Sequence, residues 1–328
     1  MGSSYKSAFI TGAAGMVGSH LVDELLAKNI EVTAMDDLSV GKEENVKQHL
    51  NNPHFHFFKA DILDLETLLS KVRHADVVVH LAATKKIGEE GSSYRTLTIN
   101  SKGTENALKL AKALKAKLIF GSTSDVYGMS EDLPFKEDGD LVLGPSLIKR
   151  WSYAVAKLYG EQMVNAFQKE FHVPCVILRY FGAFSERASF TWSGGHVPIF
   201  IDAILRNEEV TIHGDGSQTR CMGHVSDLVR GTILAMDSQK AVGEIINLGN
   251  DEELSVLDTA KLIHKIANTG HPLKIKYVPM KELFGEYKDI LRRKPDLTKA
   301  KQLLSFKPQV SIKQAIELTI HAHSSHVS

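Results

Sequence analysis

A glycine-rich turn near the N-terminus constrains the fold of this chain more than any other feature. The run Thr11-Gly12-Ala13-Ala14-Gly15-Met16-Val17-Gly18 stands between an apolar segment, residues 8–11, and an amphipathic one, residues 17–28. Glycines spaced by three let a backbone turn tightly, approach a pyrophosphate and pack a helix on a strand, while the helix N-terminus offers N–H groups to the phosphate. We therefore expect a strand–turn–helix unit that binds a dinucleotide. The contacts predicted in this turn are Gly12, Gly15, Met16, Val17 and Gly18.

The first half of the chain alternates short apolar runs with amphipathic stretches. The predicted strands are residues 8–11, 31–35, 54–59, 77–81, 117–120 and 175–179. The predicted helices, with apolar residues three and four apart, are residues 17–28, 65–72, 103–114 and 153–171. Because parallel strands need crossover helices that cover both faces, this alternation predicts an α/β fold, a Rossmann-type, doubly wound parallel sheet.

After residue 182 the pattern loosens into short strands and separate helices, which predicts a smaller α+β region. Residues 244–248 read as one more buried strand, so this part of the chain returns to the first domain. We expect residues 1–181 and 223–250 to form the nucleotide-binding domain. Residues 182–222 and 251–322 form the second domain, and residues 323–328 a tail.

The composition gives no support for several kinds of partner. Lys plus Arg and Asp plus Glu each total 39 of the 328 residues, so the zero net charge gives no argument for nucleic acid or an anionic membrane. Cys175 and Cys221 are too few for a disulfide framework and fit no metal-ligand spacing. The chain shows no secretory signal and no apolar run of membrane-spanning length. We expect a cytoplasmic protein that binds no metal, nucleic acid or membrane.

Acidic residues close the second predicted strand, where a carboxylate can accept hydrogen bonds from the adenosine ribose. Either Asp36 or Asp37 can fill this place, and a carboxylate there repels a 2′-phosphate, so NAD is favoured over NADP. Asp61-Ile62 follows the third strand and Leu81-Ala82-Ala83 the fourth. Both segments are expected along the cofactor at the carboxyl ends of the strands.

Tyr153 and Lys157 stand four apart, which makes them neighbours on one helical face. A tyrosine hydroxyl is a poor base because its free pKa is about 10. The Lys157 ammonium and a positive nicotinamide ring would lower that pKa and let tyrosinate take a substrate proton. The pattern alone also fits a chance surface pair. Upstream, the run Gly121-Ser122-Thr123-Ser124-Asp125-Val126-Tyr127-Gly128 follows the fifth strand and supplies hydroxyls at the mouth of the same crevice.

Taken together, these motifs and His80-Leu81-Ala82-Ala83 resemble the extended short-chain dehydrogenases/reductases, the NAD-dependent nucleotide-sugar epimerase/dehydratase family. The resemblance continues through Gly-Asp-Gly-Ser-Gln-Thr-Arg at 214–220 and Arg-Arg-Lys-Pro-Asp at 292–296, and it covers nearly the whole chain. It implies tightly bound NAD⁺, a nucleotide-diphosphate sugar, here a UDP-sugar, as substrate, and a homodimer formed through the helices at 103–114 and 153–171.

The resemblance also implies roles for single residues. Thr123 shares the substrate hydroxyl with Tyr153, and Lys157 holds the nicotinamide ribose. Arg220 and Arg293 clamp the diphosphate, for which guanidinium forks are well suited; as isolated features they also fit surface charges. The predicted catalytic residues are Thr123, Ser124, Asp125, Tyr153 and Lys157. Further predicted cofactor contacts are Lys85, Asn100, Ser122 and Tyr180. The predicted substrate contacts are Lys85, Thr123, Tyr153, Gly182, His196, Val197, Thr211, Arg220 and Arg293.

Family members of this kind oxidise C4 of the sugar, and the 4-ketosugar then has three fates. It is reduced on its other face by 4-epimerases, loses CO₂ from C5 in uronate decarboxylases, or loses water across C5–C6 in 4,6-dehydratases. Dehydratases follow the threonine with Asp-Glu, whereas this chain has Ser124-Asp125, which argues against dehydration. The Thr-Ser-acid pattern, Arg150-Trp151-Ser152-Tyr153 and residues 293–295 resemble the decarboxylases, whereas residues 80–89 resemble a 4-epimerase. We favour 4-epimerisation of a UDP-hexose or UDP-hexuronate, with UDP-glucuronate decarboxylation as the alternative.

One segment departs from the family pattern. Gly182 stands where the family usually has an asparagine that contacts the diphosphate, and residues 186–196 are unfamiliar. Sugar specificity is therefore open. Two other classes of protein are considered. A net dehydrogenase would release NADH instead of returning the hydride, and a non-catalytic NAD sensor is disfavoured because Tyr153 and Lys157 are both present.

Overall fold

The computed structural model describes residues 5–85, 92–188, 195–279 and 290–327, without the side chains of 323–327. Its centre is a seven-stranded sheet in the order β11-β6-β5-β4-β1-β2-β3, with every neighbouring pair parallel. The strands are β1 (Ser7–Thr11), β2 (Glu31–Asp36), β3 (Phe55–Lys59), β4 (Val77–His80), β5 (Lys117–Thr123), β6 (Cys175–Tyr180) and β11 (Ile245–Leu248). The predicted doubly wound parallel sheet is confirmed.

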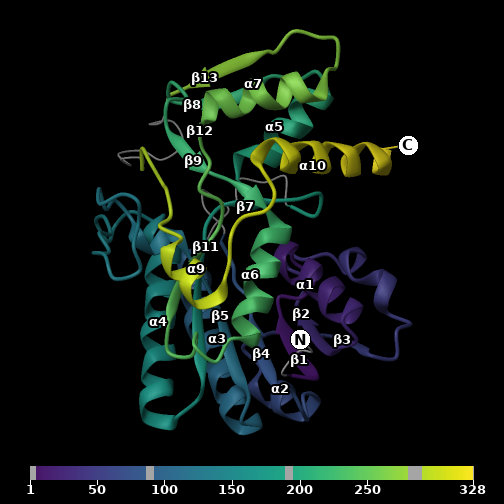
Figure 1. Ribbon diagram of the computed structural model, residues 1–328, viewed down its shortest axis with the longest axis vertical. Coiled ribbons are helices and arrows are strands. Elements are labelled where there is room, and N and C mark those ends of the chain that lie inside the picture. The colour runs from purple at the N-terminus through teal and green to yellow at the C-terminus, as the bar shows by residue number, and fades with distance from the viewer. Residues whose placement is uncertain (1–4, 86–91, 189–194, 280–289, 328) are drawn as a thin grey trace.

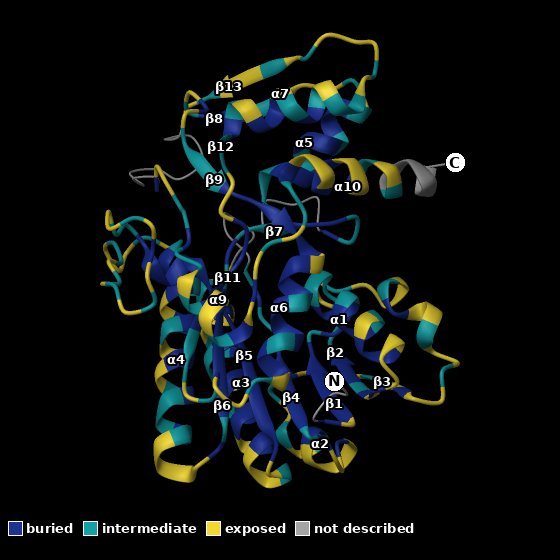
Figure 2. Cartoon of the chain, viewed as in Figure 1, coloured by how far each residue is buried: buried dark blue, intermediate teal, exposed yellow. Residues whose placement is uncertain are grey.

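Helices cover both faces of this sheet because the strands are apolar on both sides (Figures 1 and 2). In β1, Ala8 and Ile10 pack into one core, whereas Phe9 packs into the core on the opposite face. The first core is closed by α1 (Met16–Ala27), α6 (Val225–Asp237) and α9 (Thr298–Leu304). The second is closed by α2 (Leu65–Lys71), α3 (Ser93–Leu114) and α4 (Trp151–Phe171).

The remaining elements lie together above the sheet in Figure 1. They are β7 (Ala183–Phe184), α5 (His196–Leu205), β8 (Val210–His213), β9 (Thr219–Cys221), β10 (Gly223–His224), β12 (Glu253–Ser255), α7 (Val256–Ala267), β13 (Ile275–Val278) and α10 (Ile312–Val327). The strands among them pair as three two-stranded sheets, β7 with β10, β9 with β12 and β8 with β13. Together these elements enclose a third core that includes Phe200, Ile263 and Ile316. α10 includes residues 323–327, which the sequence analysis assigned to a tail. In the described part of the chain no helix is long and apolar enough to cross a membrane.

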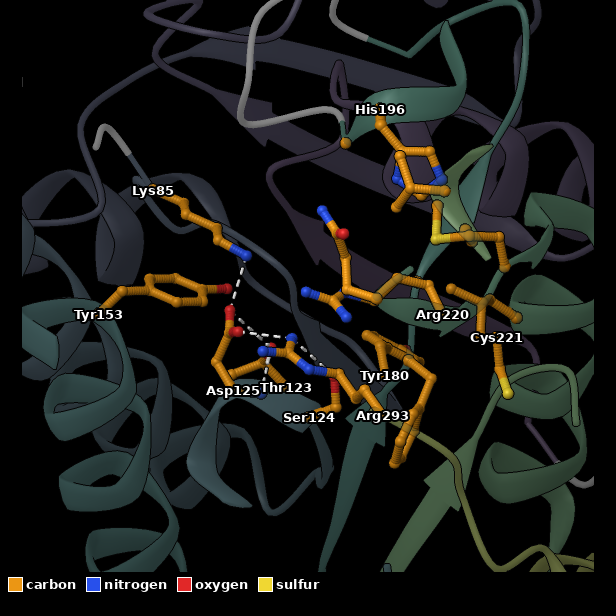
Figure 3. Close-up of a pocket in the computed structure, with 18 of the residues that line it drawn as sticks. Lys85, Thr123, Ser124, Asp125, Tyr153, Tyr180, His196, Arg220, Cys221 and Arg293 are labelled. Carbon is orange, nitrogen blue, oxygen red and sulfur yellow. Dashed lines mark hydrogen bonds and ion pairs between the residues drawn. The ribbon is translucent and has the colours of Figure 1, made fainter. Parts of the chain in front are cut away.

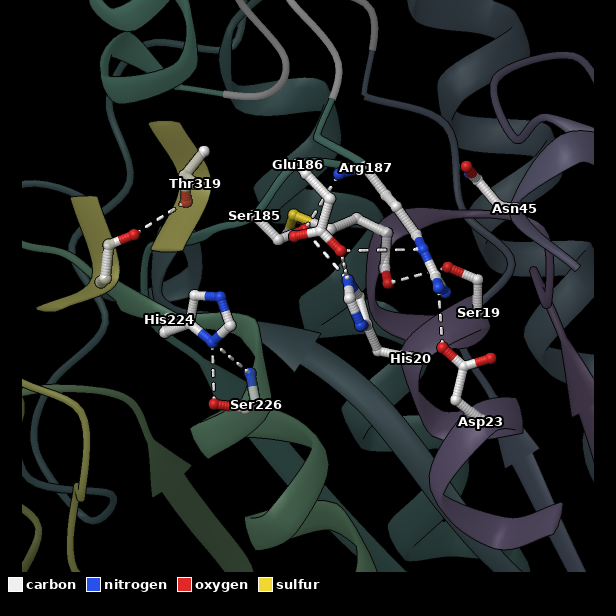
Figure 4. Close-up of polar contacts among 12 residues, drawn as sticks. Ser19, His20, Asp23, Asn45, Ser185, Glu186, Arg187, His224, Ser226 and Thr319 are labelled. Atoms are coloured by element: carbon white, nitrogen blue, oxygen red, sulfur yellow. Dashed lines mark hydrogen bonds and ion pairs between the residues drawn. The ribbon is translucent and has the colours of Figure 1, made fainter. Parts of the chain in front are cut away.

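A polar cluster joins this upper region to the first helix (Figure 4). His20 of α1 lies 3.2 Å from the Ser185 hydroxyl and 3.4 Å from the Glu186 carboxylate. One turn further along, Asp23 forms an ion pair of 2.8 Å with Arg187. Burial, followed by the Arg187 charge, lowers the pKa of His20 to about 4, so His20 is neutral at pH 7. The segment after β7 is thereby fixed to the helix that follows the glycine turn.

Candidate active site

The glycine turn is held by close backbone contacts that no larger residue allows. Gly12 has φ +71, and a Cβ there would lie 2.7 Å from the Ala82 nitrogen. A Cβ on Gly18 would lie 2.2 Å from the Gly12 carbonyl oxygen. α1 begins directly after Gly15, which has no side chain to cap the N–H groups of the first turn. These groups face whatever lies beyond the turn, as an anion site requires.

A first cavity lies against this turn, at the carboxyl ends of β1, β2 and β4. Its lining includes the predicted contacts Gly12, Gly15, Asp36, Asp37, Ile62, Leu81, Ala82 and Ala83. Asp36 is buried and accepts hydrogen bonds from the backbone N–H groups of Ala14 and Leu38, at 2.9 and 2.8 Å. Burial raises the pKa of Asp36. The Asp37 carboxylate accepts hydrogen bonds from the backbone N–H and the hydroxyl of Ser39, two residues further along.

Asp61 and Asn100 are among the predicted cofactor contacts that lie outside this lining. Asp61 accepts from the backbone N–H of Leu63, at 2.9 Å, and closes its own turn. Asn100 of α3 is fully buried and exchanges two hydrogen bonds with the backbone of Thr84. Asn100 therefore acts through the loop after β4, because it holds in place the segment that lines the cavity.

A second cavity of about 370 Å³ lies where β5, β6, α4 and α5 meet (Figure 3). Its volume lies in the range of small-molecule sites. The predicted residues that line it are Met16, Val17, Lys85, Ser122, Thr123, Ser124, Asp125, Tyr153, Tyr180, Gly182, His196, Thr211, Arg220 and Arg293. Lys157 is buried beneath it, and Val197 packs into the third core.

Tyr153 and Lys157 come from consecutive turns of α4, but their surroundings differ. Burial, followed by the Asp125 charge, raises the pKa of Tyr153, and a hydrogen bond from Thr123 works in the opposite direction. The Lys157 ammonium donates to the Gly121 carbonyl at 2.7 Å and lies 4.8 Å from the centre of the Phe120 ring. The lowering of the Tyr153 pKa that we expect from Lys157 together with the nicotinamide ring stays a prediction.

Asp125 is the centre of a buried ion cluster in this cavity. Its two oxygens accept from Lys85 Nζ and Arg293 Nη1, each at 2.6 Å. Burial favours the neutral acid, but Lys85 and then Arg293 outweigh it and hold the pKa of the Asp125 carboxyl well below its usual range. Lys85 also lies 5.1 Å from the centre of the Tyr153 ring. Lys85 thus connects the ionised Asp125 carboxylate with Tyr153, the predicted base.

The far end of the cavity differs from the family pattern. A Cβ on Gly182 would lie 2.3 Å from Met222 Sδ, so the thioether fills the place of a side chain at 182. His196, the first residue of α5, packs edge-on against Phe200 with 5.3 Å between ring centres. Its Nε2 atom has no hydrogen-bond partner among the described residues. Burial and the Arg220 charge lower the pKa of His196 to about 3.

Sequence reasoning missed several lining residues, including Arg150, His213 and Met222. Arg150 directly precedes α4 and affects Asp125 electrostatically. Its position three residues before Tyr153 is a signal that the sequence offered. Met222 had no such signal, because it enters the cavity only through packing against Gly182 and Gly195.

The sequence profile of the NAD dependent epimerase/dehydratase family matches residues 8–249. The chain belongs to this family. NAD is accordingly its cofactor, and the glycine cradle and the buried Asp36 at the end of β2 fit that dinucleotide. The predictions of the family and of NAD are confirmed.

Relatives of known activity cover almost the whole chain. A UDP-N-acetyl-α-D-glucosaminuronate decarboxylase of Bacillus cytotoxicus is 38% identical over 96% of this chain and 97% of its own. UDP-glucuronic acid decarboxylase 1 of Xenopus tropicalis is 35% identical over 96% of this chain and 72% of its own. A solved UDP-glucuronic acid 4-epimerase of Bacillus cereus, with UDP-glucuronic acid and NAD, is 31% identical with a TM-score of 0.85, over 98% of this chain and 100% of its own. This chain is an NAD-dependent sugar-modifying enzyme of the same family.

Proposed function

We propose that this enzyme oxidises C4 of a UDP-hexuronate and releases the C5 carboxyl group as CO₂. The observation that carries the proposal is the pairing of Asp125 with both Lys85 and Arg293, beside Tyr153 and Thr123. The curated relatives that are 38% and 35% identical are decarboxylases of such uronates, which supports it.

The first step needs a base at the C4 hydroxyl. Tyr153 and Thr123 line the cavity together, so the Tyr153 oxygen takes the hydroxyl proton while Thr123 orients that oxygen. Bound in the glycine cradle beside Asp36, NAD would supply the acceptor for the C4 hydride and the hydride for the later reduction. The Lys157 ammonium, which donates to the Gly121 carbonyl, would hold the nicotinamide ribose of NAD. The oxidised sugar is a β-keto acid, because C5 bears the carboxyl group next to the C4 ketone.

Asp125 favours the loss of CO₂ from this keto acid. A substrate carboxylate that reaches this end of the cavity meets cations already paired with an ionised carboxylate. Two like charges in a poorly hydrated site repel each other, and that repulsion is relieved when the C5–carboxyl bond breaks. The electron pair of that bond moves to the C4 oxygen, where Tyr153 and Thr123 donate hydrogen bonds. A proton from water then adds to C5. Hydride from NAD would reduce C4, and Tyr153 gives the proton that it took in the first step back to the C4 oxygen.

The charge of the lining fits an anionic nucleotide sugar. Among the described residues that line the cavity, four are cationic (Lys85, Arg150, Arg220 and Arg293) and one, Asp125, is acidic. Arg220 lies beside His196 and the start of α5, away from the Tyr153 end, where it suits the diphosphate. The cationic lining thus suits the diphosphate end of a UDP-hexuronate.

4-Epimerisation is the second candidate. It is supported by the UDP-glucuronic acid 4-epimerase of B. cereus and by a UDP-glucose 4-epimerase of Thermotoga maritima, which is 29% identical with a TM-score of 0.86 over 98% of this chain and 100% of its own. Both reactions begin with the same oxidation at C4. They differ in whether the carboxyl group survives.

Product analysis separates the two candidates. The enzyme is incubated with UDP-glucuronate, UDP-N-acetylglucosaminuronate, UDP-glucose and UDP-N-acetylglucosamine, and products are identified by NMR while CO₂ is measured. We expect CO₂ and a UDP-pentose from one or both uronates. Formation of the C4 epimer without CO₂ would instead establish epimerisation.

We also propose that the enzyme is a homodimer. α3 and α4 lie side by side and expose apolar side chains at helical spacing: Tyr94 and Leu97 on α3, and Val155 and Tyr159 on α4. A second copy would cover these side chains. Cytoplasmic location stays a prediction.

A further inference from the structure

A buried carboxylate lies one helical turn beyond Lys157 and takes no part in the steps above. Glu161 is 1% exposed and falls on the same face of α4 as Tyr153 and Lys157, at successive intervals of four residues. A buried carboxylate is costly unless it is paired and hydrogen-bonded. Its partners therefore show what it does.

Glu161 binds the two strands that form the floor of the cavity. Its Oε1 atom accepts from Ser122 Oγ at 2.5 Å and from Arg179 Nε at 3.0 Å, and Oε2 accepts from Arg179 Nη2 at 2.8 Å. Ser122 is in β5 and also lines the cavity, whereas Arg179 is in β6. Ser122, a predicted cofactor contact, is thereby oriented from behind by Glu161.

Lys157 lies one helical turn before this carboxylate on α4. The groups around its ammonium are the Gly121 carbonyl, the Phe120 ring and His80 of β4. His80 is neutral, because burial and then the Lys157 charge lower its pKa to about 3, and it lies between the hydroxyls of Thr11 and Thr104. Burial lowers the pKa of Lys157 to about 8, and Glu161 acts against that change.

We propose that Glu161 is a positioning residue for the Tyr153–Lys157 pair: its buried carboxylate balances the charges of Lys157 and Arg179 and anchors Ser122 beneath the nucleotide. Without that charge, Arg179 loses its carboxylate partner, and Lys157 loses the negative charge that opposes the effect of burial. Lys157 is the one that can lose its proton, because arginine stays charged. The inference deepens the proposed function, since this pair performs its first step.

The test is Glu161→Gln, which keeps the shape of the side chain and removes its charge. The ¹³Cε shift of Lys157 is followed with pH in ¹³C-lysine-labelled enzyme with NAD bound, and its signal is assigned by comparison with Lys157→Met. We expect the midpoint of the Lys157 titration to fall by about one pH unit or more, which lowers the charged fraction about tenfold above that midpoint. The fall in kcat on the alkaline side should move to lower pH by the same amount.

Two variants serve as controls. Glu161→Asp keeps the charge and should titrate close to the wild type, and Glu170→Gln removes an exposed charge from the same helix and should change nothing. An unchanged Lys157 midpoint in Glu161→Gln would overturn the proposal. If that variant does not fold, Glu161→Gln with Arg179→Met removes both members of the buried pair, a replacement that cores tolerate, and the same midpoint decides. The NMR titration needs no substrate, so it gives its answer even if the proposed reaction is wrong.

Discussion

The charge on Asp125 governs the electrostatics of the reacting end of the cavity. Lys85 and Arg293 each form an ion pair with it, so a substrate carboxylate would compete with Asp125 for these two cations. Because the pKa of Asp125 lies well below its usual range, the carboxylate is ionised at neutral pH. Under the proposed function, this ionised carboxylate is the group that favours release of CO₂.

Asp125→Asn tests this role. The amide leaves Lys85 and Arg293 to bind the uronate directly, which stabilises the carboxylate and slows its loss. We expect CO₂ release to fall about tenfold or more, while oxidation at C4, followed as absorbance at 340 nm, continues. Asp138→Asn, at an exposed position outside the cavity, is the control. Equal rates of CO₂ release in Asp125→Asn and the wild type would contradict the role.

Tyr153→Phe tests the base. The ring remains and only the proton acceptor is lost, so NAD should stay bound while turnover falls by about 10²–10⁴-fold. Tyr159→Phe, on the same helix but half exposed, should turn over normally. Both are measured as product formed per NAD-loaded enzyme. A Tyr153→Phe rate within about threefold of the wild type would remove Tyr153 from the mechanism.

Gly182 and Met222 are expected to behave as one unit. Gly182→Asn, which restores the usual family residue, forces its Cβ against Met222 Sδ and should lower both the melting temperature and the affinity for UDP. Gly182→Asn with Met222→Ala removes the opposing side chain and should recover most of the loss. Differential scanning fluorimetry and titration calorimetry with UDP measure the two effects. Additive effects of the two substitutions would show that the residues are independent.

Local motifs predicted most of the site, because carboxyl ends of parallel strands meet at one edge of the sheet. Thr123 and Asp125 stand at the carboxyl end of β5 on that edge, and Tyr153, in the first turn of α4, lines the same cavity. Glu161 and Met222 could not be assigned in the same way, since their roles arise from contacts with β6 and with Gly182 that are distant in sequence.

At the scale of elements, α3 shows where periodicity falls short. The sequence analysis began this helix at residue 103, whereas the helix starts at Ser93. The first ten residues escaped the periodicity because they mix polar side chains with apolar ones on exposed turns. The signal that marks the true start is Ser92, whose side chain accepts a hydrogen bond from the Arg95 N–H at 3.1 Å. The strands were predicted more closely, since buried parallel strands form nearly continuous apolar runs.

Ser92→Ala should therefore destabilise the start of α3. Loss of an N-cap side chain costs about 1 kcal/mol of unfolding free energy. Urea unfolding followed by circular dichroism measures the change. Ser93→Ala, within the first turn, removes a hydroxyl without removing the cap and should have a smaller effect. If the two variants unfold alike, Ser92 does not cap the helix in solution.

At the scale of the whole molecule, the cavity is assembled from both regions of the chain. Thr123 and Tyr153 come from the sheet and α4, while His196 and Arg220 come from the elements above it. The ion pair between Asp23 and Arg187 fixes the segment after β7 to α1. The outer face of α3 and α4 remains as a surface whose apolar residues the single chain does not cover.

The exposed apolar face of α3 and α4 predicts a homodimer. Tyr94 is 79% exposed and Tyr159 is 50% exposed, and apolar area of this kind is buried when two copies pack helix against helix. Light scattering at micromolar concentration should give about twice the 36.2 kDa of one chain. Leu97→Glu with Tyr159→Glu places charges in the contact and should yield monomers that still hold NAD, because neither residue lines a cavity described here. Leu318→Glu, at an equally exposed apolar position on α10, should remain dimeric. A wild-type mass of one chain would show that no dimer forms. Dissociation by Leu318→Glu would place the interface on α10.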